Sequence, residues 1–76
     1  MVIKVLGSGC KNCNLLEQNV IKALNKLGKT AEIEKVTDYS EILSYGVSST
    51  PALVVDENLV VAGRTPSPSQ LEKYFI

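Results

Sequence analysis

The chain has 76 residues, close to half of them are apolar, and eight basic residues balance eight acidic ones. This length allows one domain, and we expect residues 1–76 to form it. The basic residues form no stripe, which argues against a nucleic-acid partner. No apolar run approaches the ~18 residues of a membrane-spanning helix. The first residues lack the basic and apolar segments of a signal peptide, so the sequence predicts a cytoplasmic protein with no membrane partner.

The first half of the chain predicts a strand, a helix and a second strand. Residues Val2–Leu6 are β-branched and mostly apolar, which is typical of a buried strand. Apolar residues then recur at helical spacing from about Lys11 to Leu27, and Gly28 suits the left-handed position after a helix. A second strand is expected at Ala31–Val36. Two strands joined by a helix are expected to run parallel.

A short helix and a hairpin are expected next. Asp38 and Glu41 have the spacing of a capping box, which predicts a helix start at this point. Apolar runs at Ala52–Val55 and Leu59–Ala62 then flank a turn. Asn58 is expected to take the left-handed conformation that such a turn needs. These two strands should therefore pair antiparallel.

The last helix has the clearest start signal in the sequence. Ser67 suits the N-cap, Pro68 the first helical position and Gln70 the third, where its side chain can complete a capping box. The predicted order of elements is therefore β-α-β-α-β-β-α. It combines a parallel β-α-β unit with an antiparallel hairpin and a closing helix.

The segment GSGCKNC, residues 7–13, holds both cysteines of a chain that has no histidine. A structural disulfide across so short a ring stabilises by only ~2 kcal/mol, and a reducing compartment would open it. We read Gly7 to Gly9 as an exposed strand-to-helix turn, which argues against two buried inert thiols. A zinc site would lack half of its four ligands. Redox exchange and binding of a soft ion such as Cu(I) are the readings left open.

The positions of the two cysteines predict unequal roles in redox exchange. Cys10 is expected at the helix start, where unpaired N–H groups, the helix dipole and Lys11 lower the pKa of its thiol. Cys13 lies one turn further in and should stay protonated until needed. Cys10 would then attack a client disulfide, and Cys13 would release the reduced client. Gly9 lets a client backbone approach, and Lys11 with Asn12 is expected to tune the reduction potential.

The segments IKVLGSGCKNC, AEIEKVTD, YGVSSTPALVV and VVAGRTPS occur in this order along the full length. Together they resemble the thioredoxin-like superfamily, most closely its small redox-active disulfide proteins, or minimal glutaredoxin-like thioredoxins. The resemblance implies a thioredoxin-like α/β fold, with a four-stranded mixed sheet flanked by three helices. It implies a thiol-disulfide oxidoreductase without a cofactor, acting on disulfide-containing proteins or small molecules. A thioredoxin-reductase-like enzyme or glutathione would reduce it, and no exposed apolar stripe calls for more than a monomer.

The resemblance also assigns a role to Thr50 and Pro51. In this superfamily the proline before the third strand is cis and lies beside the dithiol, and Pro51 is the matching residue here. A cis bond would expose the backbone N–H and C=O of Thr50 beside Cys10, as an edge to which a client strand can dock. Proline itself has no N–H that could compete for the client.

Two departures from the superfamily pattern concern the proton and glutathione. Thioredoxins usually carry a buried acid on the strand before the motif, whereas this strand offers only Lys4, either a proton acceptor for Cys13 or an ordinary solvated lysine. Glutaredoxins bind glutathione partly through a Gly-Gly turn and an acid at the last helix. The matching stretch AGRTPSPSQ keeps Gly63 but no acid, although Arg64 and the helix start at Ser67 could hold a carboxylate. General dithiol exchange is therefore favoured over a glutathione-specific role.

Two functions of other classes compete with exchange. A Gly-x-x-Cys-x-x-Cys sequence after a first strand also resembles the heavy-metal-associated domains, metallochaperones that hold Cu(I) between two thiolates. That fold runs β-α-β-β-α-β and ends in a strand, whereas here the hairpin comes late and a helix closes the chain. The other alternative is a redox-responsive interaction module without turnover, which the sequence does not separate from a catalyst.

Overall fold

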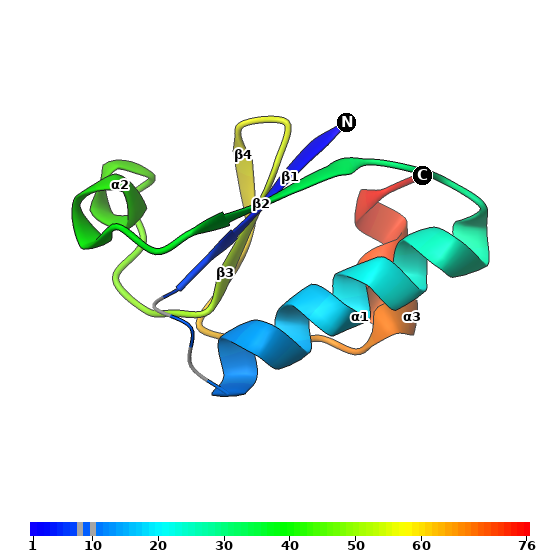
Figure 1. Cartoon of the computed structure of the whole chain (residues 1–76), viewed down its shortest axis with the longest axis horizontal. Helices are drawn as coiled ribbons and strands as arrows, with labels where there is room; N and C mark the ends of the chain where they lie inside the picture. Colours follow the sequence, from blue (N-terminus) through cyan, green and yellow to red (C-terminus); the bar gives the residue numbers. More distant parts are fainter. Residues whose placement is uncertain (8, 10) are drawn as a thin grey trace.

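The structure is a computed structural model that describes residues 1–7, 9 and 11–76, so the predictions for Cys10 lie outside the described residues. In this part of the chain the elements are β1 (Val2–Leu6), α1 (Lys11–Leu27), β2 (Glu32–Val36), α2 (Tyr39–Ser44), β3 (Ala52–Val55), β4 (Asn58–Ala62), α3 (Pro68–Leu71) and the 3₁₀ turn η1 (Glu72–Tyr74). The order is the predicted one (Figure 1). The chain closes with helical turns, unlike the metallochaperone fold considered above.

The strands form one mixed sheet in the order β2-β1-β3-β4. β1 runs parallel to β2 and antiparallel to β3, which in turn pairs antiparallel with β4. This arrangement confirms the α/β fold class and the predicted strand directions. It also places β1 and β3 side by side in the middle of the sheet. Because these two strands are antiparallel, the segment after β1 and the segment before β3 lie at the same end of the sheet.

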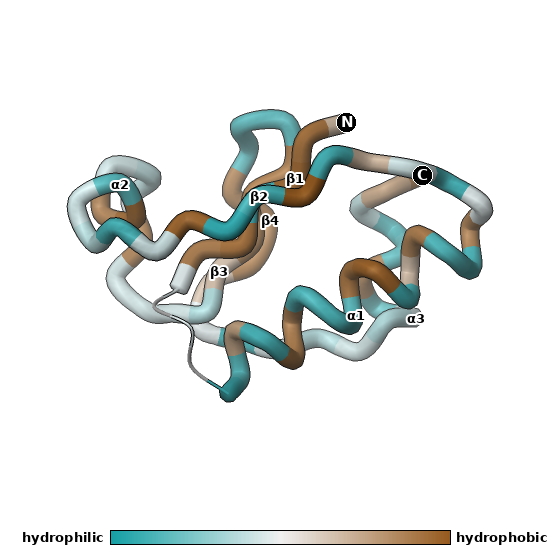
Figure 2. Tube along the Cα trace, viewed as in Figure 1, coloured by the Kyte–Doolittle hydropathy of each residue, from teal (hydrophilic) through white to brown (hydrophobic). Residues whose placement is uncertain are grey.

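Each face of the sheet carries its own apolar cluster, because successive strand residues point to opposite faces. One cluster joins the sheet to α1 and α3 and consists of Ile3, Val5, Leu16, Val20, Ala23, Leu24, Leu53, Val55, Val61, Leu71 and Phe75. The other joins it to α2 and consists of Leu6, Val36, Ile42, Val47, Ala52 and Val54. Figure 2 shows the hydrophobic colour concentrated on the central strands and in bands along α1. The short α2 covers one face, and the longer α1 with α3 covers the other.

Helix α1 has the predicted bounds, and its C-terminal end is fixed by Gly28. The φ of Gly28 is 68°, a left-handed value that a glycine adopts without a Cβ penalty. The N–H of Gly28 donates to Asn25 O and the N–H of Lys29 to Leu24 O. This pair of bonds is the Schellman arrangement, which satisfies the last carbonyls of a helix. Gly28 thereby turns the chain back toward β2.

The starts of α2 and α3 follow their predicted capping residues to different degrees. Asp38 caps α2 by accepting a bond from Ser40 N at 2.9 Å, one residue before the predicted partner Glu41. At α3 the capping box is complete. Ser67 Oγ accepts from Gln70 N, and Gln70 Oε1 accepts from Ser67 N. The box fixes the point at which the chain turns from β4 into α3.

The hairpin between β3 and β4 corrects the prediction for Asn58. The left-handed residues are Asp56 and Glu57, with φ of 49° and 69°, and Asn58 instead begins β4 opposite Val55. A two-residue hairpin turn needs positive φ at both central residues to match the strand twist. Asp56 also ties the turn to β1, because its N–H donates to Val2 O and its carboxylate accepts from Val2 N. Strand β2 likewise begins one residue later than predicted.

Candidate functional site

Two neighbouring segments and a third that is distant in sequence meet just beyond the carboxyl end of β1. Gly7 follows β1, Cys13 lies in the first turn of α1, and Thr50 precedes β3. A Cβ added at Gly7 would overlap Cys13 Sγ and would lie 3.2 Å from Cys13 Cβ and 3.9 Å from Thr50 Cβ. The structure therefore brings the predicted site residues Cys13 and Thr50 together, with Gly7 between them.

Gly7 is buried, which corrects the reading of the strand-to-helix turn as exposed at this position. Its neighbour Gly9 is exposed, with a φ of 86° and open space where a Cβ would stand. The two glycines thus serve different purposes. Gly9 permits a left-handed backbone at the surface, whereas Gly7 leaves room for the side chain of Cys13.

Cys13 is covered, as its place one turn into the helix predicts. It is 4% exposed and shares the inner face of α1 with Leu16 and Val20. Its sulfur is disulfide-bonded in this structure, so the arrangement described is that of the oxidised protein. A cysteine held in this way is poorly accessible to a client or to an alkylating reagent from outside.

The loop before β3 is fixed from the side of β4. The Thr50–Pro51 peptide bond is cis, as the superfamily resemblance implies. Pro51 is buried while Thr50 is exposed. The carbonyl of Pro51 accepts a 2.8 Å hydrogen bond from Gly63 N, and a Cβ at Gly63 would approach Ser49 Cβ to 3.0 Å. Gly63 therefore permits the close approach that holds Thr50 at the site.

Asn19 is a residue of this region that the sequence analysis did not single out. It is a buried polar side chain on α1, and its Nδ2 donates a 2.9 Å bond to the carbonyl of Pro66. The bond ties α1 to the segment that runs from Gly63 to α3. The available signal was a polar residue at spacing three from Leu16 and four from Ala23, within an otherwise apolar helical stripe.

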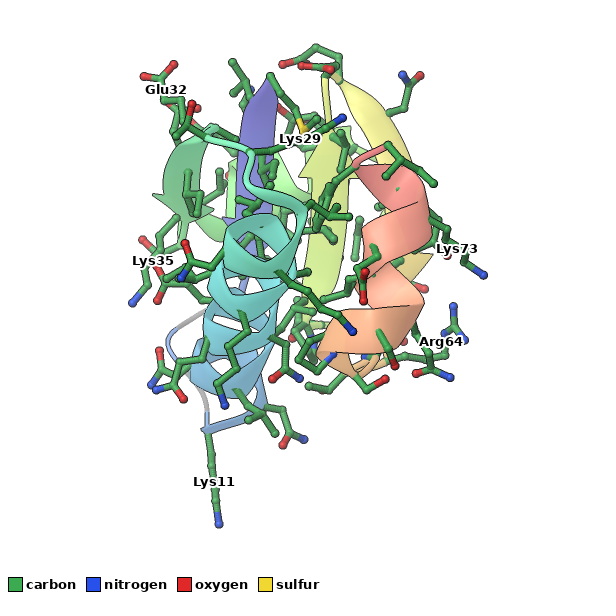
Figure 3. All side chains as sticks on the ribbon, turned by 90° about the vertical axis from the view of Figure 1, so that its right-hand side faces the viewer. Lys11, Lys29, Glu32, Lys35, Arg64 and Lys73 are labelled. Carbon is green, nitrogen blue, oxygen red and sulfur yellow. The ribbon has the colours of Figure 1, made fainter. Side chains whose placement is uncertain are left out.

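The outer face of α1 begins with exposed polar side chains. Lys11 and Asn12 are exposed, and the first turn carries no acidic residue. Figure 3 shows Lys11 projecting from one end of the molecule, with Lys29 and Glu32 at the opposite end. A hollow of about 270 Å³ lies on this face and is lined by Lys11, Asn14, Leu15 and Gln18. The surface beside the motif is thus cationic and partly apolar.

Comparison with known proteins shows the family of this chain. The thioredoxin domain family matches residues 1–76. The chain belongs to this family. It is 40% identical over 73 residues to thioredoxin of Methanothermobacter thermautotrophicus, a match covering 96% of this chain and 95% of that protein. It is 41% identical over 73 residues to thioredoxin of Methanocaldococcus jannaschii, covering 96% and 84%. The chain is accordingly a thioredoxin-like thiol-disulfide oxidoreductase.

Lys4 stands on β1, the strand on which thioredoxins usually carry a buried acid, and the structure gives it a different task. Its Nζ donates to Tyr45 Oη at 2.7 Å and to Glu57 Oε1 at 2.8 Å, and it lies 5.3 Å from the centre of the Tyr45 ring. The hydrogen bond to Glu57, followed by that to Tyr45, raises the pKa of Lys4 above its ordinary value. A lysine that stays protonated cannot accept the proton of Cys13.

Arg64 lies on the other side of the thioredoxin-like sheet. With Pro66, Gln70, Lys73 and Tyr74 it lines a hollow of about 50 Å³, and Figure 3 shows Arg64 and Lys73 on the side of α3. The carboxylate role for Arg64 stays a prediction.

Among residues 1–7, 9 and 11–76, no cluster of three metal-ligating side chains occurs. None of the helices in this part of the chain combines the length and apolar character needed to cross a bilayer.

Proposed function

We propose that this chain reduces disulfides by a two-cysteine mechanism in which Cys10 attacks and Cys13 resolves. The observation that carries the proposal is the burial of Cys13 against Gly7, beside the exposed Thr50. A covered second cysteine favours the first as the one that meets a client. The exposed Lys11 and the absence of an acid in the first turn of α1 support a thiolate at Cys10.

The steps balance as two consecutive exchanges. The Cys10 thiolate attacks one sulfur of the client disulfide, a mixed disulfide forms, and the second client sulfur leaves as a thiolate that takes a proton from water. Cys13 then loses its proton and attacks Cys10 Sγ. The Cys10–Cys13 disulfide forms and the remaining client thiolate is released. Two electrons pass to the client, and a thioredoxin-reductase-like enzyme or glutathione returns the pair to the dithiol.

Client docking is proposed at Thr50 and along the start of α1. Thr50 is exposed beside the buried Pro51, so its backbone can meet an extended client segment. Leu15, which is 44% exposed, offers an apolar contact in the hollow next to Lys11. These features suit a disulfide-containing protein as the client, and the cytoplasmic location stays a prediction from the sequence. Gly9, Lys11 and Asn12 keep their predicted roles in client approach and in setting the potential.

The order of cysteine reactivity tests this proposal. The reduced protein is alkylated at pH 7 and digested, and the label on each cysteine is followed by mass spectrometry. We expect Cys10 to react well before Cys13. Cys13→Ser should accumulate mixed disulfides through Cys10, whereas Cys10→Ser should form none. Equal labelling of the two cysteines would contradict the assigned roles.

The two competing functions give different results in the same preparation. A metallochaperone would bind Cu(I) tightly, and Cys10→Ser and Cys13→Ser would be equally inert toward a disulfide reagent. An interaction module would form its disulfide but would not turn over in an insulin-reduction assay coupled to a reductant. Turnover that is lost in Cys10→Ser supports the exchange mechanism.

A further inference from the structure

We propose that Gly7 is the positioning residue for the resolving cysteine: the missing side chain at Gly7 is the space that Cys13 Sγ occupies. The inference rests on the proposed function, since it concerns the step in which Cys13 attacks Cys10. Gly7 exchanges no bond or proton with the client or with either thiol, and it acts through the space that it leaves for the Cys13 sulfur. The overlap of an added Cβ with Cys13 Sγ is its direct support.

The space at Gly7 cannot be regained by a small shift of the backbone, because each surrounding segment is held separately. The N–H of Gly7 donates to Val36 O at 3.0 Å, which extends the pairing of β1 with β2. Cys13 belongs to a helix whose inner face is buried in the core, and Thr50 precedes the Pro51 carbonyl bonded to Gly63. A methyl group at position 7 must therefore displace the sulfur by rotating the Cys13 side chain.

Gly7 is needed for space, whereas the other glycines of the chain are needed for their backbone conformation. Gly9, Gly28, Gly46 and Gly63 have left-handed φ values, whereas Gly7 does not. Alanine can adopt the backbone of Gly7, and where the conformation is compatible such a change stabilises by reducing the entropy of the unfolded chain. Any harm done by Gly7→Ala therefore comes from the lost space.

A displaced sulfur should slow resolution and leave the first attack intact. A misplacement of about 1 Å at a reacting group can cost on the order of 10²-fold in rate, so we expect Gly7→Ala to slow the Cys13 step by roughly 10- to 100-fold. In the proposed mechanism Cys10 acts as nucleophile before Cys13 is needed, so its attack on a reagent should keep the wild-type rate. The two steps thus separate positioning from a general loss of activity.

The two steps are read from one stopped-flow trace. The reduced protein is mixed with one equivalent of dithiobis(nitrobenzoate), which releases one coloured thiolate when Cys10 attacks and a second when Cys13 resolves. We expect Gly7→Ala to keep the first phase and to slow the second. Gly28→Ala is the matched control, because it adds the same methyl group with strain at a left-handed glycine far from Cys13. It should lose stability and keep both phases.

The results separate the two proposals. If the wild-type protein lacks a second phase, the two-cysteine mechanism fails before Gly7 is considered. If the wild type resolves and Gly7→Ala resolves equally fast, the positioning role alone is wrong. The same conclusion follows if Gly28→Ala slows the second phase as much as Gly7→Ala does, since stability would then be the cause.

A double-mutant cycle covers the case in which Gly7→Ala does not fold. Cys13→Ala removes the sulfur that the new methyl group would overlap and leaves only Cβ, 3.2 Å from it, so Gly7→Ala should lower the urea midpoint much less in the Cys13→Ala background than in the wild type. Recovery of folding in this background supports the contact. A double variant as damaged as Gly7→Ala would place the cost elsewhere and overturn the inference.

Discussion

The hydrogen bond between Asn19 and Pro66 can be tested by Asn19→Ala. The substitution removes a buried donor and leaves the carbonyl of Pro66, itself a buried residue, without that partner. An unsatisfied buried acceptor costs about 1–3 kcal/mol. Alanine offsets part of this, because it favours the helix over asparagine by up to about 0.7 kcal/mol. The net loss in the free energy of unfolding should therefore be about 1.5 kcal/mol at the middle of the range.

Asn25→Ala on the same helix provides the control for helix propensity. Asn25 is exposed, so its substitution should leave stability unchanged or raise it slightly. The difference between the two variants cancels the propensity gain and isolates the bond, at about 1–3 kcal/mol. For a domain of this size each kcal/mol moves the melting temperature by about 4–8 °C. The assay is thermal unfolding of the reduced proteins by circular dichroism, with urea unfolding as a check on the slope.

Equal melting temperatures for Asn19→Ala and Asn25→Ala would refute the reasoning. Such a result would mean that water or a relaxed loop satisfies Pro66 at no cost, and that α1 does not hold the segment after β4. A loss of stability with an unchanged urea slope would support the bond as drawn. Since this segment begins at Gly63, which bonds Pro51, a confirmed loss would also tie the stability of α1 to the loop before β3.

Two further predictions concern Lys4 and Leu15. The folded-state pKa of Lys4 is raised, so its contribution to stability is fully present below the unfolded value of about 10.4 and is lost as pH rises through the raised value. The stability difference between wild type and Lys4→Met should therefore stay constant from neutral pH to about 10 and shrink above it, and a change near neutral pH in urea unfolding would contradict this. Leu15→Ser should raise the KM for a protein disulfide several-fold, which corresponds to the loss of ~1 kcal/mol from an exposed apolar contact. It should not slow attack on a small disulfide reagent. Ile21→Ser is the control, since Ile21 lies on the same helix and is 41% exposed against 44% for Leu15. It should change neither the KM for the protein disulfide nor the rate with the small reagent. Equal effects of the two substitutions would remove Leu15 from the docking surface.

The elements were predictable where a local signal decides them. The end of α1 follows from Gly28, because the left-handed conformation after a helix is available to glycine at little cost. The start of α3 follows from Ser67 and Gln70, which satisfy each other's backbone within four residues. The hairpin itself was predicted, but its turn residues were not. The position of the turn depends on which residues of β3 and β4 pair, and Val55 pairs with Asn58. Local propensity alone does not contain that pairing.

The site was predictable in its chemistry and less so in its packing. The spacing of Cys10 and Cys13 and the family resemblance of Thr50 and Pro51 are readable from the sequence. The burial of Gly7 is not, because it depends on residues 7, 13 and 50 meeting at one point through the pairing of β1 with β3. A glycine after a strand indicates a turn by default. Only the tertiary contact distinguishes a glycine needed for conformation from one needed for space.

The fate of Lys4 shows how this thioredoxin-family sheet accommodates a lysine on the strand where an acid is usual. Alternation along β1 points Lys4 to the face covered by α2, while α1 packs on the face of Ile3 and Val5. Glu57, held in a left-handed turn, brings its carboxylate to the lysine at the end of the sheet opposite Gly7. The positive charge is thus neutralised away from the cysteine site, and because the raised pKa keeps Lys4 protonated, it supplies no base there. In the mechanism proposed above, the proton of Cys13 must therefore leave without help from β1.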